Sequence, residues 1–118
     1  MKNEPLLCRC RYALKGVRSA FKTEASFRTQ IFFAVLAILA LAVLRPKPIW
    51  WALALLTIAS LLATELINTA IETILDRVHP EQHPLIARAK DCAAGAVFML
   101  SLASVAVWTA LILDLWMN

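Results

Sequence analysis

Residues 92–113 read CAAGAVFMLSLASVAVWTALIL, an apolar run without one charged side chain. A helix that crosses the hydrocarbon core of a membrane needs about 20 apolar residues. This run reaches that length by itself. It therefore predicts a membrane-spanning helix.

Two further apolar stretches precede this run. The first covers residues 29–44 and ends at RPKP, residues 45–48; the second covers residues 49–75 and is unusually long. The first is slightly short for a span, and Phe27 and the aliphatic stem of Arg28 extend it. We predict an all-α fold with one membrane domain over residues 1–118, in which an N-terminal interfacial helix at about 5–26 precedes spans at about 28–45, 49–76 and 90–115.

The overall composition agrees with a small membrane protein. Of the 118 residues, 61% are hydrophobic and 17% are charged, and the mean hydropathy is +0.71. A water-soluble domain of this size cannot bury so much apolar surface. This excludes a disordered chain, a secreted disulfide framework, a fibrous repeat and an ordinary cytosolic enzyme. The net charge of +4 lies outside the apolar runs and indicates topology and lipid contact, so no nucleic-acid partner is expected.

The basic residues also predict the orientation. Most of them precede the first span or lie in the loop at residues 77–90, whereas only Arg45 and Lys47 lie between the first two spans and none follows the third. Cytoplasmic segments carry an excess of lysine and arginine. We therefore expect a cytoplasmic N-terminus and 77–90 loop, with the C-terminus outside.

The segment before the first span has the pattern of an amphipathic helix. Its apolar residues recur every three or four positions, beside a parallel basic stripe; the apolar members are Leu7, Cys10, Leu14, Val17 and Phe21. Such a helix lies on an anionic leaflet with its apolar side down. The alternative is a basic segment that only sets topology.

Four polar residues lie on the second apolar stretch: Glu65, Asn68, Glu72 and Asp76. At 100° per residue they fall within about 80° of the circumference of a helix. Carboxylates that face lipid are costly, so this stripe is expected to face a cavity, a partner helix or water. The alternative is a structural stripe that packs helices together.

Depth in the membrane separates the possible roles of these acids. A carboxylate near the interface can hold a hydrated divalent cation, and a buried one can accept a proton from a bound hydroxyl. Glu24 with Arg28, and Lys90 with Asp91, are expected at the same side of the membrane. Carboxylates and cations at one level suit phosphoryl transfer, although the chain has no Gly-rich phosphate loop. The pattern itself predicts a small membrane protein with an acidic, metal-binding site that faces the cytoplasm.

Several motifs resemble the prokaryotic diacylglycerol kinase family. ELINTAIE at residues 65–72 is followed by Asp76 and by AKD at 89–91, and both KGVRSAF at 15–21 and EASFR at 24–28 precede it. The resemblance covers nearly the whole chain from residue 12 onward. It implies a homotrimeric kinase of the bacterial inner membrane that uses MgATP to phosphorylate a lipid alcohol, with sites built between protomers.

The resemblance also implies roles for individual residues. Glu65 corresponds to the catalytic base that acts on the lipid hydroxyl, and Glu24 and Glu72 to the carboxylates that hold Mg²⁺. The positions implied to bind the nucleotide are Tyr12, Glu24, Glu72, Glu81, Gln82, His83, Lys90 and Asp91. The positions implied to bind the lipid are Arg18, Ser19, Ala20, Phe21, Ser26, Phe27, Arg28, Thr29, Gln30, Glu65, Asn68, Ala94 and Trp108.

Some residues depart from the diacylglycerol kinase pattern. Residues 93–95, AAG, and Thr69 after Asn68 are more similar to the undecaprenol kinases of the same family. Gln30 stands where a carboxylate is common, and Pro5 where an arginine is expected. The resemblance favours diacylglycerol as the substrate and phosphatidic acid as the product, with undecaprenol as the alternative.

Two alternative hypotheses assign the chain to other functional classes. One is a small proton-coupled transporter that uses a deep glutamate, although such proteins usually have four spans. The other is a non-catalytic assembly subunit whose acidic stripe only packs helices.

Overall fold

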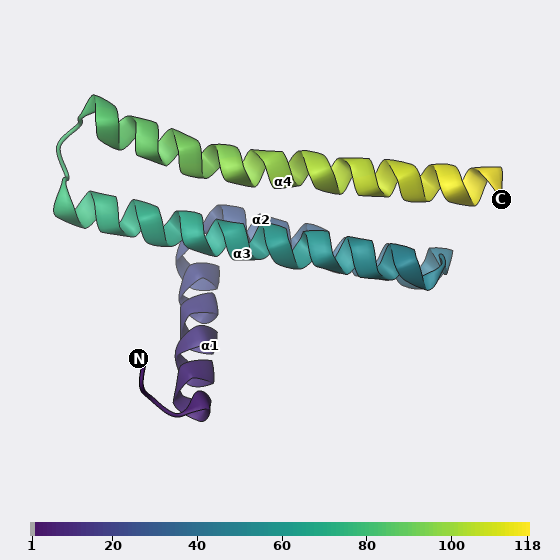
Figure 1. Ribbon diagram of the computed structural model, residues 1–118, viewed down its shortest axis with the longest axis horizontal. Coiled ribbons are helices and arrows are strands. Elements are labelled where there is room, and N and C mark those ends of the chain that lie inside the picture. The colour runs from purple at the N-terminus through teal and green to yellow at the C-terminus, as the bar shows by residue number, and fades with distance from the viewer. Residues whose placement is uncertain (1) are drawn as a thin grey trace.

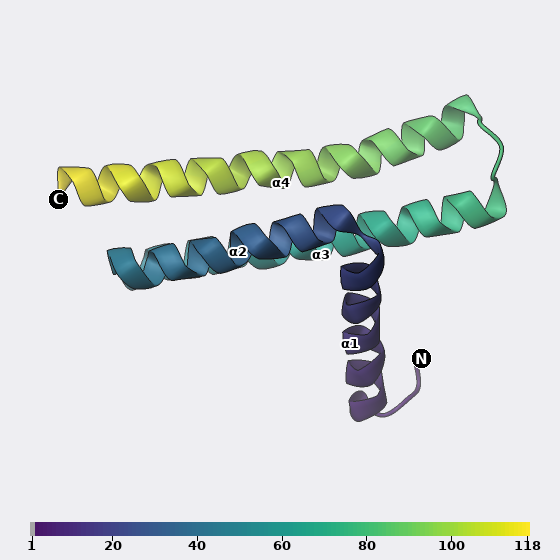
Figure 2. The same cartoon turned by 180° about the vertical axis from the view of Figure 1, so that it is seen from behind.

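The computed structural model describes residues 2–118, and in them the chain folds into four helices. These are α1 (Leu6–Thr23), α2 (Ala25–Leu44), α3 (Pro48–Val78) and α4 (Pro84–Met117). Helices α2, α3 and α4 run alongside one another, whereas α1 projects away from them to one side (Figures 1 and 2). The described part of the chain contains no strand, so the all-α prediction is confirmed.

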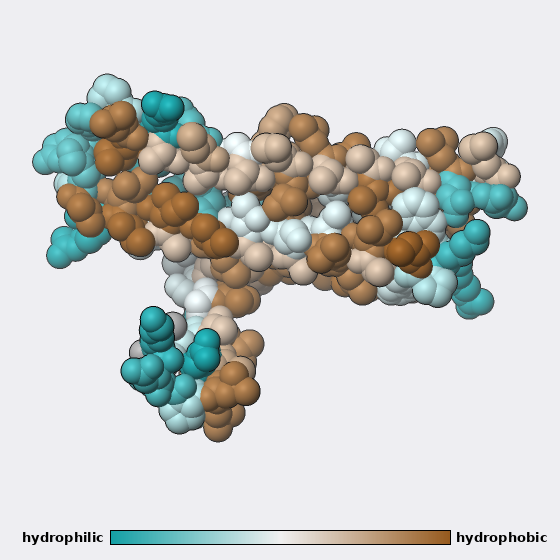
Figure 3. Space-filling view, in the orientation of Figure 1, coloured by the Kyte–Doolittle hydropathy of each residue, from teal (hydrophilic) through white to brown (hydrophobic). Residues whose placement is uncertain are grey.

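Helices α2, α3 and α4 are each long and apolar enough to cross a membrane. At a rise of about 1.5 Å per residue, their lengths are about 30 Å, about 46 Å and about 51 Å. The hydrocarbon core is about 30 Å thick. The chain is therefore a multi-pass membrane protein in which α2 matches the core, whereas α3 and α4 extend beyond it. Figure 3 shows hydrophilic residues gathered where α3 and α4 are connected.

The breaks between the helices follow from local residue chemistry. Arg45 ends α2 in the left-handed conformation, with φ of 51°. Pro48 occupies the first turn of α3, where a backbone N–H would have no partner within the helix, so its missing N–H costs no hydrogen bond. Pro84 opens α4 in the same way, and Nδ1 of His83 accepts a hydrogen bond from the Leu85 N–H at 3.1 Å. This cap explains why α4 begins at residue 84, before the predicted start of the third span at about residue 90.

The corner between α1 and α2 is fixed by one arginine and two buried side chains. Nη1 of Arg28 donates hydrogen bonds to the carbonyl oxygens of Phe21, at 2.8 Å, and Lys22, at 3.1 Å. These carbonyls lie in the last turn of α1, where a cation is favourable. Ala20 and Phe27 are buried at the same corner. Arg28 therefore holds α1 at its angle to the three long helices.

The internal core is small and lies at the end of the molecule where α2 turns into α3. Leu41, Ala54 and Leu111 are fully buried there, and three tryptophans pack against them: Trp50, Trp51 and Trp108. Helix α3 packs against both α2 and α4, whereas the backbones of α2 and α4 do not approach each other closely in residues 2–118. Most other large apolar side chains are exposed on the outside of the helices. This arrangement suits a protein whose solvent is lipid.

A hydrogen bond joins α3 to α4 at the same end. The indole Nε1 of Trp50 donates to Oδ2 of Asp114 at 2.9 Å, and the other oxygen, Oδ1, accepts from Nδ2 of Asn118 at 2.9 Å. Both oxygens of the Asp114 carboxylate therefore have a donor. The contact connects the first turn of α3 to the last turn of α4.

Replacing the indole donor is expected to weaken this end of the bundle. Trp50→Phe should lower the free energy of unfolding by about 1 kcal/mol, the usual size of a hydrogen bond between membrane helices. Equilibrium unfolding in mixed detergent micelles measures it. Trp116→Phe is the matched control, because Trp116 is 87% exposed, and it should leave stability unchanged. Equal effects of the two substitutions would show that the Trp50–Asp114 contact contributes nothing.

Candidate functional site

The most buried polar side chain in residues 2–118 is Glu65, in the middle of α3, with only 5% of its surface exposed. Oε1 of its carboxylate accepts a hydrogen bond from Oγ of Ser26 at 2.6 Å. Oε2 accepts one from Nε2 of Gln30 at 3.1 Å. Ser26 and Gln30 are one helical turn apart on α2, so a single face of α2 supplies a donor to each oxygen.

Two buried oxygens beside this cluster have no hydrogen-bond partner among the described residues. They are Oε1 of Gln30 and Oδ1 of Asn68, and Asn68 lies one turn beyond Glu65 on α3. Buried polar atoms are normally hydrogen-bonded. A donor from a bound molecule or from another subunit would satisfy these two oxygens.

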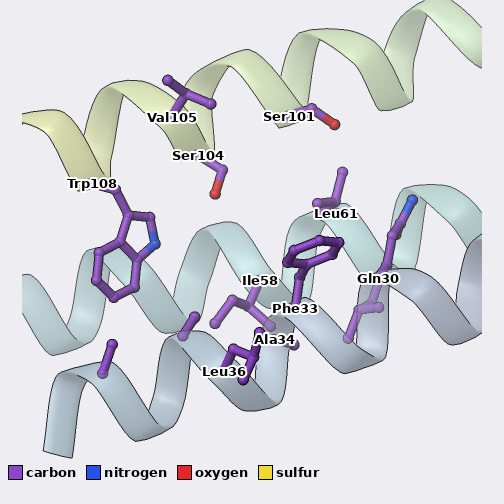
Figure 4. A pocket seen from close by; sticks show the side chains of 13 residues that line it. Gln30, Phe33, Ala34, Leu36, Ile58, Leu61, Ser101, Ser104, Val105 and Trp108 are labelled. Atoms are coloured by element: carbon purple, nitrogen blue, oxygen red, sulfur yellow. The ribbon is translucent and has the colours of Figure 1, made fainter. Parts of the chain in front are cut away.

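An apolar groove of about 620 Å³ leads away from Gln30 between α2 and α4, with α3 as its floor (Figure 4). Gln30 lies toward one end of the groove and Trp108 toward the other (Figure 4). Ser101 and Ser104 contribute hydroxyl groups from α4. The other lining residues are apolar: Phe33, Ala34, Leu36, Ala37, Ala40, Ile58, Leu61, Leu62 and Val105. A smaller cavity of about 500 Å³ adjoins it and shares Ser104, Val105 and Trp108. The groove has the lining that a hydrocarbon chain needs.

A second, polar cleft of about 650 Å³ lies at the connection between α3 and α4. Four residues of the implied nucleotide site line it: Glu81, Gln82, His83 and Lys90. Asp76 lines it as well, and its Oδ1 is 2.6 Å from Nζ of Lys90. Nδ1 of His79 is 3.0 Å from the carbonyl oxygen of Glu81 and organises the loop. The cleft combines one cation, two carboxylates and two imidazoles at one end of the molecule.

The remaining implied site residues lie outside these two hollows. Glu24 is half-buried at the corner between α1 and α2, and Glu72 is half-buried two turns beyond Glu65 on α3. Ala20, Phe27 and Arg28 belong to the α1–α2 corner. The others do not line the groove or the polar cleft: Tyr12, Arg18, Ser19, Phe21, Thr29, Asp91 and Ala94.

No three side chains of His, Cys, Asp or Glu gather at one place within residues 2–118 in a way that would hold a metal ion. Mg²⁺ does not require such a cage, because it keeps several waters and binds through one or two carboxylates and substrate phosphates. Neither Glu24 nor Glu72 forms an ion pair with a described residue. Carboxylate oxygens are the kind of ligand that Mg²⁺ takes, so the chemistry of each of these two side chains is compatible with this ion.

Sequence reasoning missed two features of the site. It did not find the hydroxyl of Ser26 on the carboxylate of Glu65, nor the hydroxyls of Ser101 and Ser104 in the groove. The i, i+4 spacing of Ser26 and Gln30 was the available signal, because it places two polar side chains on one face of a helix that is apolar from Ile31 onward.

These features define a class: small helical membrane proteins with a buried carboxylate between an apolar groove and a polar cleft. The family model of the prokaryotic diacylglycerol kinases matches residues 11–112. The chain belongs to this family.

Three curated relatives agree with this assignment. The chain is 41% identical over 109 residues to a diacylglycerol kinase of Synechocystis, a match that covers 92% of this chain and 62% of the relative. It is 38% identical to one of Haemophilus influenzae, over 75% of each chain. It is also 32% identical to the undecaprenol kinase of Bacillus subtilis, over 79% of this chain and 76% of the relative. The chain thus spans less than two thirds of the Synechocystis protein but most of the other two.

Proposed function

We propose that the protein is a lipid kinase that transfers the γ-phosphoryl group of ATP to the hydroxyl of diacylglycerol and so forms phosphatidic acid. The observation that carries this proposal is the position of Glu65, a buried carboxylate at the polar end of an apolar groove. The family assignment and the names of the diacylglycerol kinase relatives support it.

In the proposed reaction, Glu65 accepts the proton of the lipid hydroxyl. Ser26 and Gln30 fix the direction of its carboxylate through one hydrogen bond to each oxygen. A base held in one orientation needs little reorganisation when the proton moves. The groove holds an acyl chain, and its apolar walls exclude water from the neighbourhood of the hydroxyl.

The nucleotide binds at the polar end of α3 and α4. Lys90 supplies a cation for phosphate oxygens, and residues 81–83 form the wall of the cleft. Glu24 and Glu72 would hold Mg²⁺, which would neutralise charge on the phosphates. Tyr12 and Asp91 complete the nucleotide site.

The proposed membrane placement uses the way in which α1 projects to one side of the long helices. One side of the projecting α1 is hydrophilic and the other hydrophobic (Figure 3), which suits a helix that lies on the cytoplasmic leaflet of the bacterial inner membrane. Ser26, in the first turns of α2, contacts Glu65, so Glu65 lies near that surface, and Glu72 and Asp76 lie on its aqueous side.

We propose a homotrimer with active sites between protomers. The unpartnered oxygens of Gln30 and Asn68 and the outward-facing apolar surfaces of the helices support an assembly of several copies. Undecaprenol is the second candidate substrate, because the Bacillus subtilis relative carries that name and residues 93–95, AAG, are similar to that group.

The function is tested by phosphoryl transfer in mixed micelles that contain diacylglycerol or undecaprenol, with MgATP. The protein should prefer diacylglycerol, and Glu65→Gln should lower kcat at least about 100-fold because it removes the general base. Asp114→Asn, which removes an acid at the other end of the bundle, should retain activity. Normal turnover of Glu65→Gln would refute the role of Glu65, and preference for undecaprenol would refute the assigned substrate.

The proposed metal site predicts a change in magnesium dependence. Glu72→Gln should raise the Mg²⁺ concentration needed for half-maximal activity about tenfold, because one of two ligating carboxylates is lost. A titration of activity with Mg²⁺ at saturating lipid measures this value. An unchanged Mg²⁺ titration would exclude Glu72 as a ligand, and Asp114→Asn again serves as the control.

The polar cleft predicts an effect on nucleotide binding. Lys90→Gln should raise the KM for MgATP about tenfold, because a charge-assisted contact with phosphate is lost. Its thermal stability should stay close to that of the wild type, since the Lys90–Asp76 pair is exposed. Arg88→Gln removes the same charge two residues earlier and should leave this KM unchanged. Equal KM values for the two variants would place the nucleotide elsewhere.

A further inference from the structure

Ser26 lies between the buried carboxylate of Glu65 and the surface of the helix bundle. Its hydroxyl donates to Oε1 of Glu65 at 2.6 Å, a short hydrogen bond of the kind formed with a carboxylate. Ser26 itself is exposed, whereas Glu65 is only 5% exposed. A molecule that approaches along the surface of α2 therefore meets the hydroxyl before the carboxylate.

Both carboxylate oxygens of Glu65 already have a donor within the chain. Ser26 occupies Oε1, and Nε2 of Gln30 occupies Oε2 at 3.1 Å. Each oxygen keeps a second lone pair, but both belong to a side chain that is only 5% exposed. The exposed hydroxyl of Ser26 is therefore the more accessible acceptor for the lipid hydroxyl. The hydroxyl of Ser26 has one hydrogen, which points to Glu65, and its oxygen keeps two lone pairs that can accept another hydrogen bond.

We propose that Ser26 is a catalytic residue that relays the proton of the lipid hydroxyl to Glu65. This inference rests on the lipid kinase function proposed above and adds a residue that touches the reacting hydroxyl. The lipid hydroxyl donates to Oγ of Ser26, which donates in turn to Oε1 of Glu65. This series of hydrogen bonds requires no movement of α2 or α3.

The atoms balance in this step. The O–H bond of the lipid breaks and its proton bonds to Oγ of Ser26, while the proton of Ser26 moves to Oε1 of Glu65. The lipid oxygen forms a bond to the γ-phosphorus of ATP. The bond from that phosphorus to the bridging oxygen breaks, and ADP leaves with the electron pair. Ser26 ends the step as a neutral hydroxyl, and Glu65 carries the proton.

Gln30 does not replace Ser26 in this role. Its Nε2 is a donor without a lone pair to accept the proton, and its Oε1 is buried. Gln30 is a positioning residue that holds the second carboxylate oxygen, so that Oε1 stays directed at Ser26.

The test compares Ser26→Ala, Ser26→Thr and the wild type in micelles that contain diacylglycerol and MgATP. Ser26→Ala should lower kcat about 100-fold, with the KM values for lipid and ATP within about twofold of the wild type, because the relay acts in the chemical step. Ser26→Thr retains a hydroxyl and should recover kcat to within about tenfold of the wild type. Thr73→Ala is the control, because Thr73 is an exposed hydroxyl on α3 that bonds only to its own helix.

A second readout separates the relay from a structural role. Two protons move together in the relay. A plot of the wild-type kcat against the deuterium fraction of the solvent should therefore be curved. The same plot for Ser26→Ala should be a straight line, because one proton remains. Thermal unfolding of each variant confirms that the fold is retained.

The outcomes distinguish the relay from the function on which it rests. If the wild type phosphorylates lipid and Ser26→Ala keeps kcat within about threefold, the relay is refuted and Glu65 acts directly. A Ser26→Thr variant as slow as Ser26→Ala, or a straight-line plot for the wild type, would also refute it. A wild type without lipid kinase activity would instead refute the proposed function.

Discussion

The packing of α2 against α3 depends on the burial of one carboxylate, Glu65, in a protein that has few other internal polar groups. Glu65 is compatible with its position only because α2 presents Ser26 and Gln30 to its two oxygens. An unpaired buried charge is costly, more so in a surrounding of low dielectric. The register between α2 and α3 is therefore set by polar contacts at one end. At the other end it is set by the small core of Leu41, Ala54 and Leu111.

Helix α3 is the element on which the site is assembled. It carries the acidic stripe and packs against α2 on one side and α4 on the other. Because the backbones of α2 and α4 do not approach each other closely, an apolar groove that ends at Gln30 lies between them. The Trp50–Asp114 contact holds α4 against α3 beyond the far end of this groove. A chain of only four helices thus provides an apolar hollow and a polar cleft at different levels of the same central helix.

Much of this arrangement can be predicted from the sequence, because long apolar runs and helical periodicity are local properties. The three candidate spans, the acidic stripe on α3 and the break at residues 45–48 follow from them. The contact of Ser26 with Glu65 joins residues 39 positions apart and depends on which face of α2 meets α3, which no local pattern specifies. The Trp50–Asp114 contact spans 64 positions and was missed for the same reason. The early start of α4 was missed because residues 84–91 are too polar to be recognised as part of a span.

The unequal lengths of the helices match the protein to a bilayer of one thickness. Only α2 is as short as the hydrocarbon core, at about 30 Å, and its first turns lie level with Glu65. In a thicker bilayer, acyl chains would cover the level at which Glu65 meets Ser26, and the helices would have to tilt or the lipid would have to thin. In a thinner one, the end of the groove at Gln30 would open to water. In the proposed membrane placement, bilayer thickness therefore sets whether the carboxylate of Glu65 lies at the boundary between lipid and water.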